Sequence, residues 1–348
     1  MAVLKVLELG DYAAGYAGRL FAHQGADVVR VETPAREPAW ASAAAMTLYL
    51  HANKRRVVDV SPVVMAQLAA QADVVICEGA TASAVQATGF DEFTARAKVA
   101  VTPYGMTGPK RDWAATNNVL LAAGGYTFIM GDPDRAPLSL PGHYLDFQVG
   151  ALAYAAAMAV LSGEDAPAGN TADIGKLETL MSMSQFTTVR YHCAGEIRTR
   201  HGSDYHFVTP SELFRCADGW VYVNIVATFW DAFALFLDRP EVLLDARFTT
   251  NDLRMENRDA LHAIIAEALI DIPVAELGMR AAECRVPVGV VHTFDDVLGL
   301  EHLRTRGFWV RGRAAGQDVD VPGVPFRIDG VERPDLGVTS ADREVPAW

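Results

Sequence analysis

The fold of this chain is decided by residues 3–32, which read VLKVLELGDYAAGYAGRLFAHQGADVVRVE. The apolar run Val3 to Leu9 predicts a strand, residues Ala13 to Gln24 predict a helix, and Ala26 to Glu32 predict a second strand. A strand, a helix and a strand in this order form a right-handed crossover between parallel strands. The stretch therefore predicts an α/β fold built on a parallel sheet.

The glycines after the first predicted strand are Gly10, Gly15 and Gly18. Dinucleotide sites of the nicotinamide type use the pattern G-x-G-x-x-G, which lets backbone N–H groups and a helix N-terminus meet a pyrophosphate. The spacing here differs from that pattern and disfavours a nicotinamide cofactor. Glu32 is accordingly interpreted as an ordinary strand-end acid rather than a ribose ligand.

Short apolar strands and helices continue along the first half of the chain. Further strands are expected at residues 57–60, 72–77 and 99–103, with helices at 63–72 and 117–125. The last of these strands leads into the glycine loop Tyr104-Gly105-Met106-Thr107-Gly108-Pro109. Ligands of doubly wound sheets bind at the carboxyl ends of the strands, so this loop marks a candidate ligand edge.

The chain changes character at the polar segment 194–203, which follows a predicted helix over 177–191. Beyond it, residues 214–225 predict a β-hairpin, and amphipathic helices are expected at 230–237, 258–270 and 274–284. Strands over 306–326 are expected to return to the first domain. We therefore expect a large domain at 1–195 with 305–348, a small α+β domain at 205–300, and linkers at 196–204 and 301–304.

The composition of the 348 residues restricts the possible partners. The net charge of −13 argues against nucleic acid, whose binding needs clustered Lys and Arg. The nine histidines show no metal-ligand spacing, and the scattered cysteines form no CxxC pair, so we expect no metal site and reduced thiols. No run approaches the roughly twenty apolar residues that span a bilayer. A cytoplasmic protein without a membrane partner is expected.

Asp146 lies near the N-terminus of the helix predicted by the Ala-rich, uncharged run 151–161, which is expected to be buried because it is apolar all round. An aspartate at a helix N-terminus is most often an N-cap, because its side chain accepts from free backbone N–H groups. The alternative is a nucleophile or base held at the floor of a cleft. Both interpretations are compatible.

Three consecutive cations, Lys54, Arg55 and Arg56, follow Asn53 and lead into a predicted strand. Such a run is most often a solvated turn. Because Lys and Arg bind phosphate groups well, contacts with an anionic ligand are the alternative.

A series of short motifs follows one another in a fixed order along residues 3–326. They are Val6–Leu9 with Ala14-Gly15, Gly25–Glu32, Asn53–Arg55 with Val57–Asp59, Tyr104–Pro109, Gly124-Gly125, Phe214–Trp220, Asp245–Phe248, Arg254 with Asn257-Arg258, and Val286–Val288. Together they resemble the class III CoA-transferase family, which includes formyl-CoA transferase, carnitine CoA-transferase and the 2-methylacyl-CoA racemases. The resemblance implies a Rossmann-like large domain, a smaller α+β domain and an interlocked homodimer.

In this resemblance Asp146, followed by Gly150, takes the place of the family's nucleophile. The implied substrates are an acyl-CoA and a small carboxylic acid, with no metal. The carboxylate would attack the thioester to form a mixed anhydride, and the CoA thiolate would return to make an aspartyl-CoA thioester. A second acid would then collect the CoA. Backbone N–H groups of glycine turns would stabilise the oxyanions.

The resemblance also implies a strip of residues that contacts CoA. Its members are Tyr12, Ala13, Ala14, Thr33, Val58, Ser61, Gly79 and Ala80, with Lys54 and Arg55 added as cations for its phosphate groups. Residues 77–80 depart from the family, where an Asn and an aromatic residue are common at this place. That departure leaves open a degenerate, non-catalytic CoA-binding member.

Racemisation of a 2-methylacyl-CoA on the same fold is a further alternative. That reaction moves an α-proton with a His and an Asp on opposite faces of an enolate. The segment that holds this His in racemases corresponds to residues 115–118 here, which read Ala-Thr-Asn-Asn and cannot exchange protons. His143 could substitute, although a hydrogen bond near a helix start is its commoner role.

Overall fold

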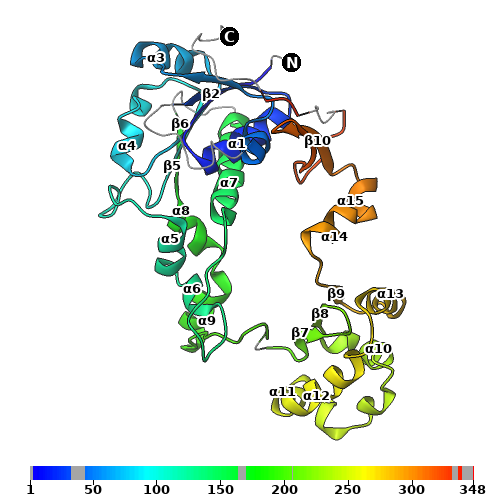
Figure 1. Cartoon of the computed structure of the whole chain (residues 1–348). Helices are drawn as coiled ribbons and strands as arrows, with labels where there is room; N and C mark the ends of the chain where they lie inside the picture. Colours follow the sequence, from blue (N-terminus) through cyan, green and yellow to red (C-terminus); the bar gives the residue numbers. More distant parts are fainter. Residues whose placement is uncertain (1–2, 33–43, 164–169, 206, 331–335, 339–347) are drawn as a thin grey trace. The chain divides into compact units, whose positions relative to one another are not determined.

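The computed structural model describes residues 3–32, 44–163, 170–205, 207–330, 336–338 and 348. The chain forms two compact units (Figure 1). The large unit comprises Met1–Thr127, Ser139–Ile197 and Glu301–Trp348, and the small unit comprises Phe128–Leu138 and Arg198–Leu300. Residues 128–138, which were expected in the large domain, group with the small unit. Arg200 accounts for this, because its guanidinium donates to the backbone oxygens of Phe128, Asp132 and Pro133.

The large unit is built on a six-stranded sheet with the strand order β3-β2-β1-β4-β5-β6. Every neighbouring pair is parallel, which confirms the predicted parallel sheet. The strands are β1 (Lys5–Leu9), β2 (Asp27–Glu32), β3 (Arg55–Val58), β4 (Val74–Glu78), β5 (Ala97–Thr102) and β6 (Asn170–Gly175). The order runs outward in both directions from β1 and β4, so the topological switch point of this Rossmann-like sheet lies between their carboxyl ends.

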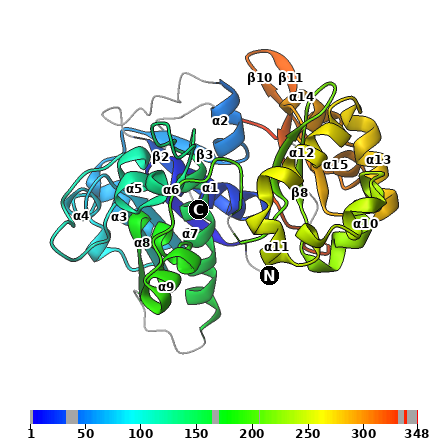
Figure 2. The ribbon, with the colours of Figure 1, turned by 90° about the horizontal axis from the view of Figure 1, so that it is seen from below.

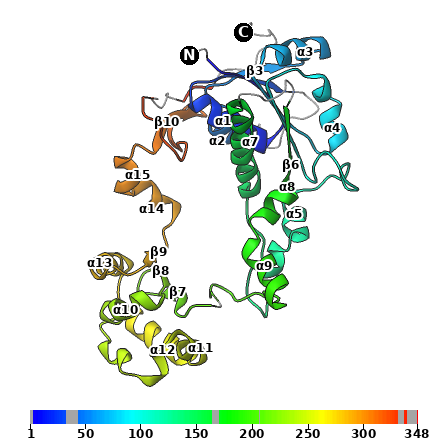
Figure 3. The same ribbon diagram turned by 180° about the vertical axis from the view of Figure 1, so that it is seen from behind.

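Helices cover both faces of this sheet. The helices that lie within the large unit are α1 (Tyr12–His23), α2 (Ala44–His51), α3 (Pro62–Gln71), α4 (Ala82–Gln86), α5 (Asn117–Ala123), α7 (Tyr144–Ser162), α8 (Lys176–Ser182), α9 (Gln185–Ala194) and α15 (Glu301–Thr305). Alternate strand residues such as Val6 and Leu7 belong to separate clusters, one shared with α1 and α7 and the other with α3 and α4. Figure 3 shows α1 and α7 together on one face, and Figure 2 shows α3 and α4 on the side away from them.

The predicted strands of the C-terminal region form a separate sheet in the large unit. They are β10 (Trp309–Ala314) and β11 (Gln317–Pro322), which pair with each other in antiparallel fashion. Val310 and Val321 pack with Leu48 of α2, so this hairpin contacts the large unit through a helix rather than by extending the parallel sheet. The return of the chain to the first domain is therefore achieved without a seventh parallel strand.

The predicted helix over 177–191 is wrong in one respect, because the structure contains α8 and α9 in its place. The break lies at Met183 and Ser184, whose backbone N–H groups donate to Leu180 and Met181 in tight turns. The Ser184 hydroxyl also donates to the Met181 oxygen at 2.8 Å. A serine that bonds to nearby backbone competes with helix continuation, which explains the interruption.

The small unit combines a three-stranded antiparallel sheet with helices. Its strands are β7 (Ser211–Arg215), β8 (Trp220–Asn224) and β9 (Val288–Val290), and its helices are α10 (Trp230–Phe236), α11 (Asn251–Glu256), α12 (Arg258–Leu269), α13 (Val274–Cys284) and α14 (Phe294–Gly299). Helix α6 (Tyr126–Ile129) lies where the chain passes from the large unit to the small one. The predicted hairpin is confirmed as β7 and β8, and the three amphipathic helices as α10, α12 and α13.

Helix α7 is one-sided rather than buried all round as predicted. Its buried residues are Leu145, Asp146, Val149, Gly150, Ala153 and Ala157, which recur at helical spacing along a single face. Large side chains on the rest of its surface are open to solvent, with Tyr144 exposed by 62% and Leu152 by 43%. Contrary to the expectation that no run approaches a bilayer-spanning length, this 19-residue helix could cross a membrane by length and composition alone, and about a third of it is buried inside the protein.

Close approach of α7 to α1 depends on Gly150. A Cβ atom at this position would stand 2.6 Å from the backbone oxygen of Ala13 and 2.9 Å from Cβ of Tyr16. These distances are shorter than any ordinary contact, so a larger residue would push the two helices apart. Since Asp146 lies one turn earlier on the same face of α7, the position of Gly150 also sets the position of Asp146.

We expect Gly150→Ala to destabilise the protein by about 1–3 kcal/mol, because the added methyl group overpacks the α1–α7 contact. The measurement is the midpoint of thermal unfolding followed by circular dichroism. Gly299→Ala is the control, since a Cβ atom there meets nothing within 4 Å. An unchanged midpoint for Gly150→Ala, equal to that of the control, would contradict this account of the packing.

Candidate active site at the carboxyl edge of the sheet

Asp146 lies in the first turn of α7, and its carboxylate bonds to side chains from three places in the chain. Oδ1 accepts from Nζ of Lys176 at 2.7 Å. Oδ2 accepts from Nδ2 of Asn117 at 2.8 Å and lies 3.1 Å from Nδ1 of His143. The N-cap position of α7 is His143, so the interpretation of Asp146 as the N-cap is wrong. The carboxylate is instead held by the side chains of Lys176, Asn117 and His143.

Lys176 joins Asp146 to a second buried carboxylate. Its Nζ lies 2.6 Å from Oε1 of Glu78, while Oε2 of Glu78 accepts from the backbone N–H groups of Asp11 and Ala14, both at 3.0 Å. The turn at Gly10 makes this approach possible, because its φ is +131° and a Cβ atom there would stand 2.5 Å from Cβ of Glu78. Glu78 therefore links the ends of β1 and β4 across the switch point.

The Asp146 cluster, defined as Asp146, Lys176, Glu78, Asn117 and His143, assembles at the predicted ligand edge. Glu78 ends β4, and Lys176 directly follows β6. The glycine loop after β5 lies beside them, since the oxygen of Pro103 accepts from the N–H of Leu177 and Met106 donates to the carboxylate of Asp173. Glu78, Lys176 and the glycine loop therefore lie at carboxyl ends of parallel strands, where doubly wound sheets bind ligands.

Aromatic rings lie beside the carboxylate. The ring of Tyr12 stacks on that of His143, with centroids 3.5 Å apart and planes inclined by 17°, and Phe147 lies 6.1 Å from His143. Asp146 itself is 4% exposed. The carboxylate is thus close to the surface but covered in this conformation.

The charges of the cluster keep Asp146 ionised. Burial alone would raise the pKa of its carboxyl group, but the positive charge of Lys176 and hydrogen bonds from Lys176, Asn117 and His143 lower that pKa below its ordinary value. Burial would likewise lower the pKa of Lys176, but Glu78 and Asp146 raise it above its ordinary value. Burial and the charge of Asp146 raise the pKa of Tyr12. The cluster therefore contains one ammonium between two carboxylates.

The residues of the predicted CoA strip fall into two groups at this edge. Tyr12, Ala13, Ala14, Gly79 and Ala80 lie at the switch point, where Ala14 donates to Glu78 and Gly79 donates to Val101. Val58 ends β3, and Ser61 accepts from the N–H of Val64 as the N-cap of α3. Thr33 lies outside the described residues.

The structure does not bring Lys54 and Arg55 to the Asp146 cluster. Lys54 is 1% exposed, and its Nζ lies 2.5 Å from Oε2 of Glu8 and donates to the oxygen of Gly15 at 2.8 Å. Burial lowers the pKa of Lys54 to about 8. Arg55 begins β3 and makes two hydrogen bonds to Asp27, at 2.8 and 2.6 Å, at the opposite edge of the sheet. Both cations are therefore engaged within the large unit.

Two charged residues of the cluster, Glu78 and Lys176, were not identified as functional from the sequence. Glu78 ends the apolar strand β4, and that position at the ligand edge was an available signal. Lys176 directly follows β6, whose sequence Asn-Thr-Ala-Asp-Ile-Gly is too polar to have been expected as a strand. His143 was considered only as a substitute proton donor and Asn117 only as a group that cannot exchange protons. Within the described ranges, no group of three or more His, Cys, Asp or Glu side chains is arranged to hold a metal.

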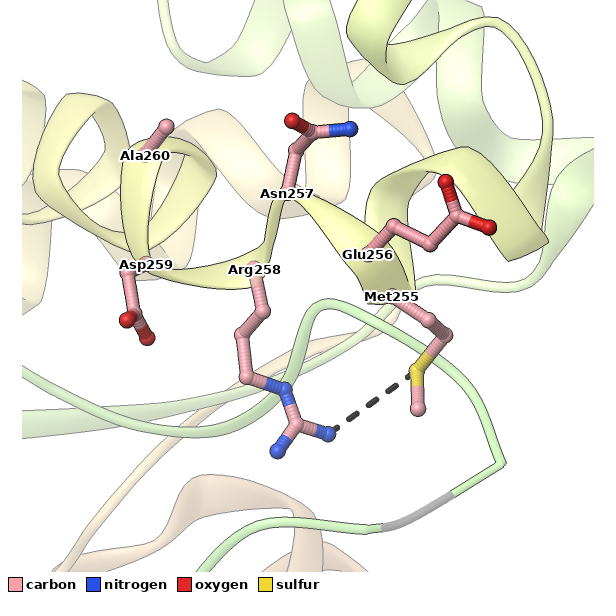
Figure 4. A pocket seen from close by; sticks show the side chains of 6 residues that line it. All are labelled: Met255, Glu256, Asn257, Arg258, Asp259 and Ala260. Carbon is pink, nitrogen blue, oxygen red and sulfur yellow. Dashed lines mark hydrogen bonds between the residues drawn. The ribbon is translucent and has the colours of Figure 1, made fainter.

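The small unit has a hollow of about 490 Å³ at the turn between α11 and α12, lined by residues 255–260. Figure 4 shows the side chains of Arg258 and Met255 directed toward each other, with Nη2 3.8 Å from the sulfur. Arg258 also forms an ion pair with Asp204. The guanidinium of Arg258 is thus already bound to Met255 and Asp204. The Asp146 cluster is therefore a stronger candidate for the catalytic site than this hollow.

Comparisons with known proteins find relatives among the CoA-transferases. The succinyl-CoA–D-citramalate CoA-transferase of Chloroflexus aurantiacus is 28% identical, covering 99% of this chain and 86% of that protein. The succinate–glutarate CoA-transferase of Agrobacterium fabrum is 25% identical, covering 92% of this chain and 87% of that protein.

Solved structures show the same fold. A CAIB/BAIF family protein from Brucella suis superposes with a TM-score of 0.82 at 23% identity, covering 98% of this chain and 95% of that one. Protein Rv3272 of Mycobacterium tuberculosis gives a TM-score of 0.83 at 21% identity, covering 97% and 96%. The model of CoA-transferase family III matches residues 1–337. With its parallel sheet, its small antiparallel domain and this match over nearly its whole length, the chain belongs to CoA-transferase family III and is a CoA-transferase.

Proposed function

We propose that this enzyme moves CoA from an acyl-CoA thioester to a small carboxylic acid through covalent intermediates on Asp146. The observation that carries the proposal is a buried carboxylate, kept ionised by three donors, at the switch point of the sheet. An ionised carboxylate is a nucleophile that needs no separate base. Its place at the ligand edge allows a substrate to approach it from the ends of the strands.

The reaction proceeds in two matched halves. Asp146 attacks the thioester carbon, the CoA thiolate leaves, and a mixed anhydride forms. The thiolate then attacks the Asp146 carboxyl carbon and releases the first acid, which leaves an aspartyl-CoA thioester. A second acid enters and reverses these steps, so that it departs as the new acyl-CoA. Each covalent step keeps the energy of the thioester within a bond of similar reactivity.

Binding of CoA is assigned to the strip at the switch point, with Tyr12, Ala13, Ala14, Gly79 and Ala80 nearest to Glu78. Val58 and Ser61 lie at the same edge of the sheet, and Thr33 remains part of the proposed strip. Lys54 and Arg55 contribute through the structure of the large unit, since both are ion-paired within it. Because several relatives carry succinyl-CoA or succinate in their names, succinyl-CoA is the first donor to test.

Racemisation is less well supported by the site. Asn117 occupies the segment where the resemblance would place the racemase His, and its amide donates to Asp146. His143 is in direct contact with Asp146 and precedes it by three residues at the same helix start. Two groups that bond to each other reach a substrate carbon from the same side, whereas racemisation needs them on opposite faces.

A homodimer is part of the proposal. The outer surface of α7 and the helices after it carry large exposed apolar side chains, among them Leu152, Met181, Phe186, Val189 and Tyr191. An apolar surface of this extent on one unit is typical of a protein interface. A cytoplasmic location is proposed as well, and it is supported by four cysteines that form no disulfide.

We expect hydroxylamine to trap Asp146 when the enzyme is incubated with succinyl-CoA. The aspartyl thioester would become a hydroxamate, which peptide mass spectrometry detects at Asp146. Asp146→Ala should lose transfer activity by about 10⁴-fold or more, because no nucleophile remains. The control is Asp27→Ala, which removes an ion-paired carboxylate of the large unit at the opposite edge of the sheet. Full transfer by Asp146→Ala would refute the mechanism.

We expect the carboxyl group of Asp146 to stay ionised down to acidic pH. Its folded-state pKa is lowered, so the stability that its ionised form contributes is present above the unfolded pKa of about 3.9 and is lost as the pH falls through the folded value. The measurement is ¹³C NMR of protein labelled at aspartate Cγ, with the signal assigned by its loss in Asp146→Ala. A titration midpoint above pH 5 would contradict this expectation, because burial would then affect the pKa of Asp146 more than the charge of Lys176 does.

We expect light scattering to give twice the chain mass of 37.6 kDa in solution. Val189→Asp places a charge on the exposed apolar surface of α9 and should shift the protein to the monomer. Leu244→Asp, at an exposed position of the small unit, should leave the mass unchanged. A monomeric wild-type protein at micromolar concentration would contradict the dimer.

A further inference from the structure

The two oxygens of Asp146 have different partners. Oδ1 accepts from the ammonium of Lys176, whereas Oδ2 lies against the amide of Asn117 and the imidazole of His143. A charged donor withdraws more electron density from an oxygen than a neutral donor does, because charge-assisted hydrogen bonds are about twice as strong. Oδ2 is therefore the better nucleophile, and Oδ1 becomes the carbonyl oxygen when Oδ2 is acylated.

The proposed reaction attacks two kinds of carbon. One is the acyl carbon of the substrate, and the other is Cγ of Asp146, which is attacked first by the CoA thiolate and later by the incoming acid. Each attack on Cγ places a negative charge on Oδ1. Oxyanions of this kind are stabilised by donors already in place, usually backbone N–H groups.

Several N–H groups of the glycine turns at this edge are already engaged by carboxylates. Asp11 and Ala14, after the Gly10 turn, donate to Glu78, and Met106, after Gly105, donates to both oxygens of Asp173. Lys176 is different, because its Nζ points at Oδ1 from 2.7 Å. The group that meets the developing charge on Oδ1 is thus an ammonium.

We infer that Lys176 is a catalytic residue that stabilises the oxyanion on Oδ1 of Asp146 whenever Cγ is attacked, an inference that rests on the proposed function. When the thiolate bonds to Cγ, an electron pair moves to Oδ1 beside Nζ. The pair returns as the Cγ–Oδ2 bond breaks, and the first acid leaves with Oδ2. When the second carboxylate bonds to Cγ, Oδ1 takes the charge again, and the C–S bond then breaks to release the CoA thiolate.

Glu78 is the positioning residue of this arrangement. Acylation makes Asp146 neutral, and a buried ammonium without a counter-charge is costly. Oε1 of Glu78 remains 2.6 Å from Nζ and supplies that charge, while the backbone N–H groups of Asp11 and Ala14 hold its other oxygen. Lys176 can therefore stay charged and in place through both halves of the reaction.

The test uses the fact that the two covalent intermediates give different products with hydroxylamine. The anhydride is attacked at the substrate carbon and yields an acyl hydroxamate, whereas the aspartyl thioester yields a hydroxamate on Asp146. We expect Lys176→Met to slow transfer by about 10²-fold or more and to raise the ratio of acyl hydroxamate to Asp146 hydroxamate by about 10-fold, because only attack on Cγ loses its donor. Acyl hydroxamate formed with Asp146→Ala gives the background to subtract.

Two variants separate this role from a structural or purely electrostatic one. Lys98→Met removes another buried lysine of the large unit, whose Nζ donates to the oxygens of Phe90 and Asp91, and should leave the ratio unchanged. Glu78→Gln with Lys176→Met serves if the single variant fails to fold, because it keeps the net charge of the cluster and leaves one carboxylate without its cation instead of two. The ratio of acyl hydroxamate to Asp146 hydroxamate should stay raised in this double variant.

The outcomes are distinct. If wild-type enzyme gives no Asp146 hydroxamate, the proposed function fails. If wild-type enzyme gives it and Lys176→Met lowers both products in the same ratio, the role of Lys176 is overturned while the function stands. A ratio restored by the double variant would also overturn it, because Lys176 would then act only by keeping Asp146 ionised.

Discussion

The ion pairs of Lys176 with Glu78 and Asp146 are the interaction on which the rest of the site depends. Lys176 follows the edge strand β6, Glu78 ends β4 in the middle of the sheet, and Asp146 belongs to a helix on one face. A single ammonium therefore fixes a strand end, a sheet centre and a helix start relative to one another. Two carboxylates this close would repel each other in a buried place, and the lysine between them makes their approach favourable.

Two close backbone contacts of the large unit help to hold this arrangement in place. Gly150 lets α7 lie directly against α1, and Gly10 lets Glu78 close over the turn at the start of α1. Both contacts use the absence of a Cβ atom to bring backbone within reach of a neighbour. The carboxylate that we propose as the nucleophile is thus positioned by rigid secondary structure rather than by a loop, which is the usual requirement for precise catalytic geometry.

Much of the architecture could be predicted from the sequence, because the information is local. Apolar runs such as Val28 to Val31 and the glycines between them specify strands, turns and parallel order without knowledge of distant contacts. Asp146 could also be selected, since an acid before an Ala-rich helix is conspicuous and the resemblance gave it a role.

The partners of the site could not be predicted, because they are set by contacts between distant parts of the chain. Lys176 and Glu78 are 98 residues apart and meet only once the sheet has formed. The same limit affected Lys54, whose partner Glu8 lies 46 residues away, so a run of three cations that looks solvated contains one that is fully buried. The one-sided burial of α7 could not be predicted for the same reason. The face of an apolar helix that becomes buried depends on the elements that pack against it.

The burial of Asp146 beside His143, on which the ring of Tyr12 stacks, bears on how water is kept from the reaction. Anhydrides and thioesters are destroyed by water, and an enzyme that admitted solvent to such intermediates would act as a thioesterase. In the proposed mechanism, a carboxylate that is 4% exposed would keep hydrolysis of these intermediates slow while the two acids exchange. The burial of the proposed nucleophile would then favour transfer of CoA over hydrolysis of the thioester.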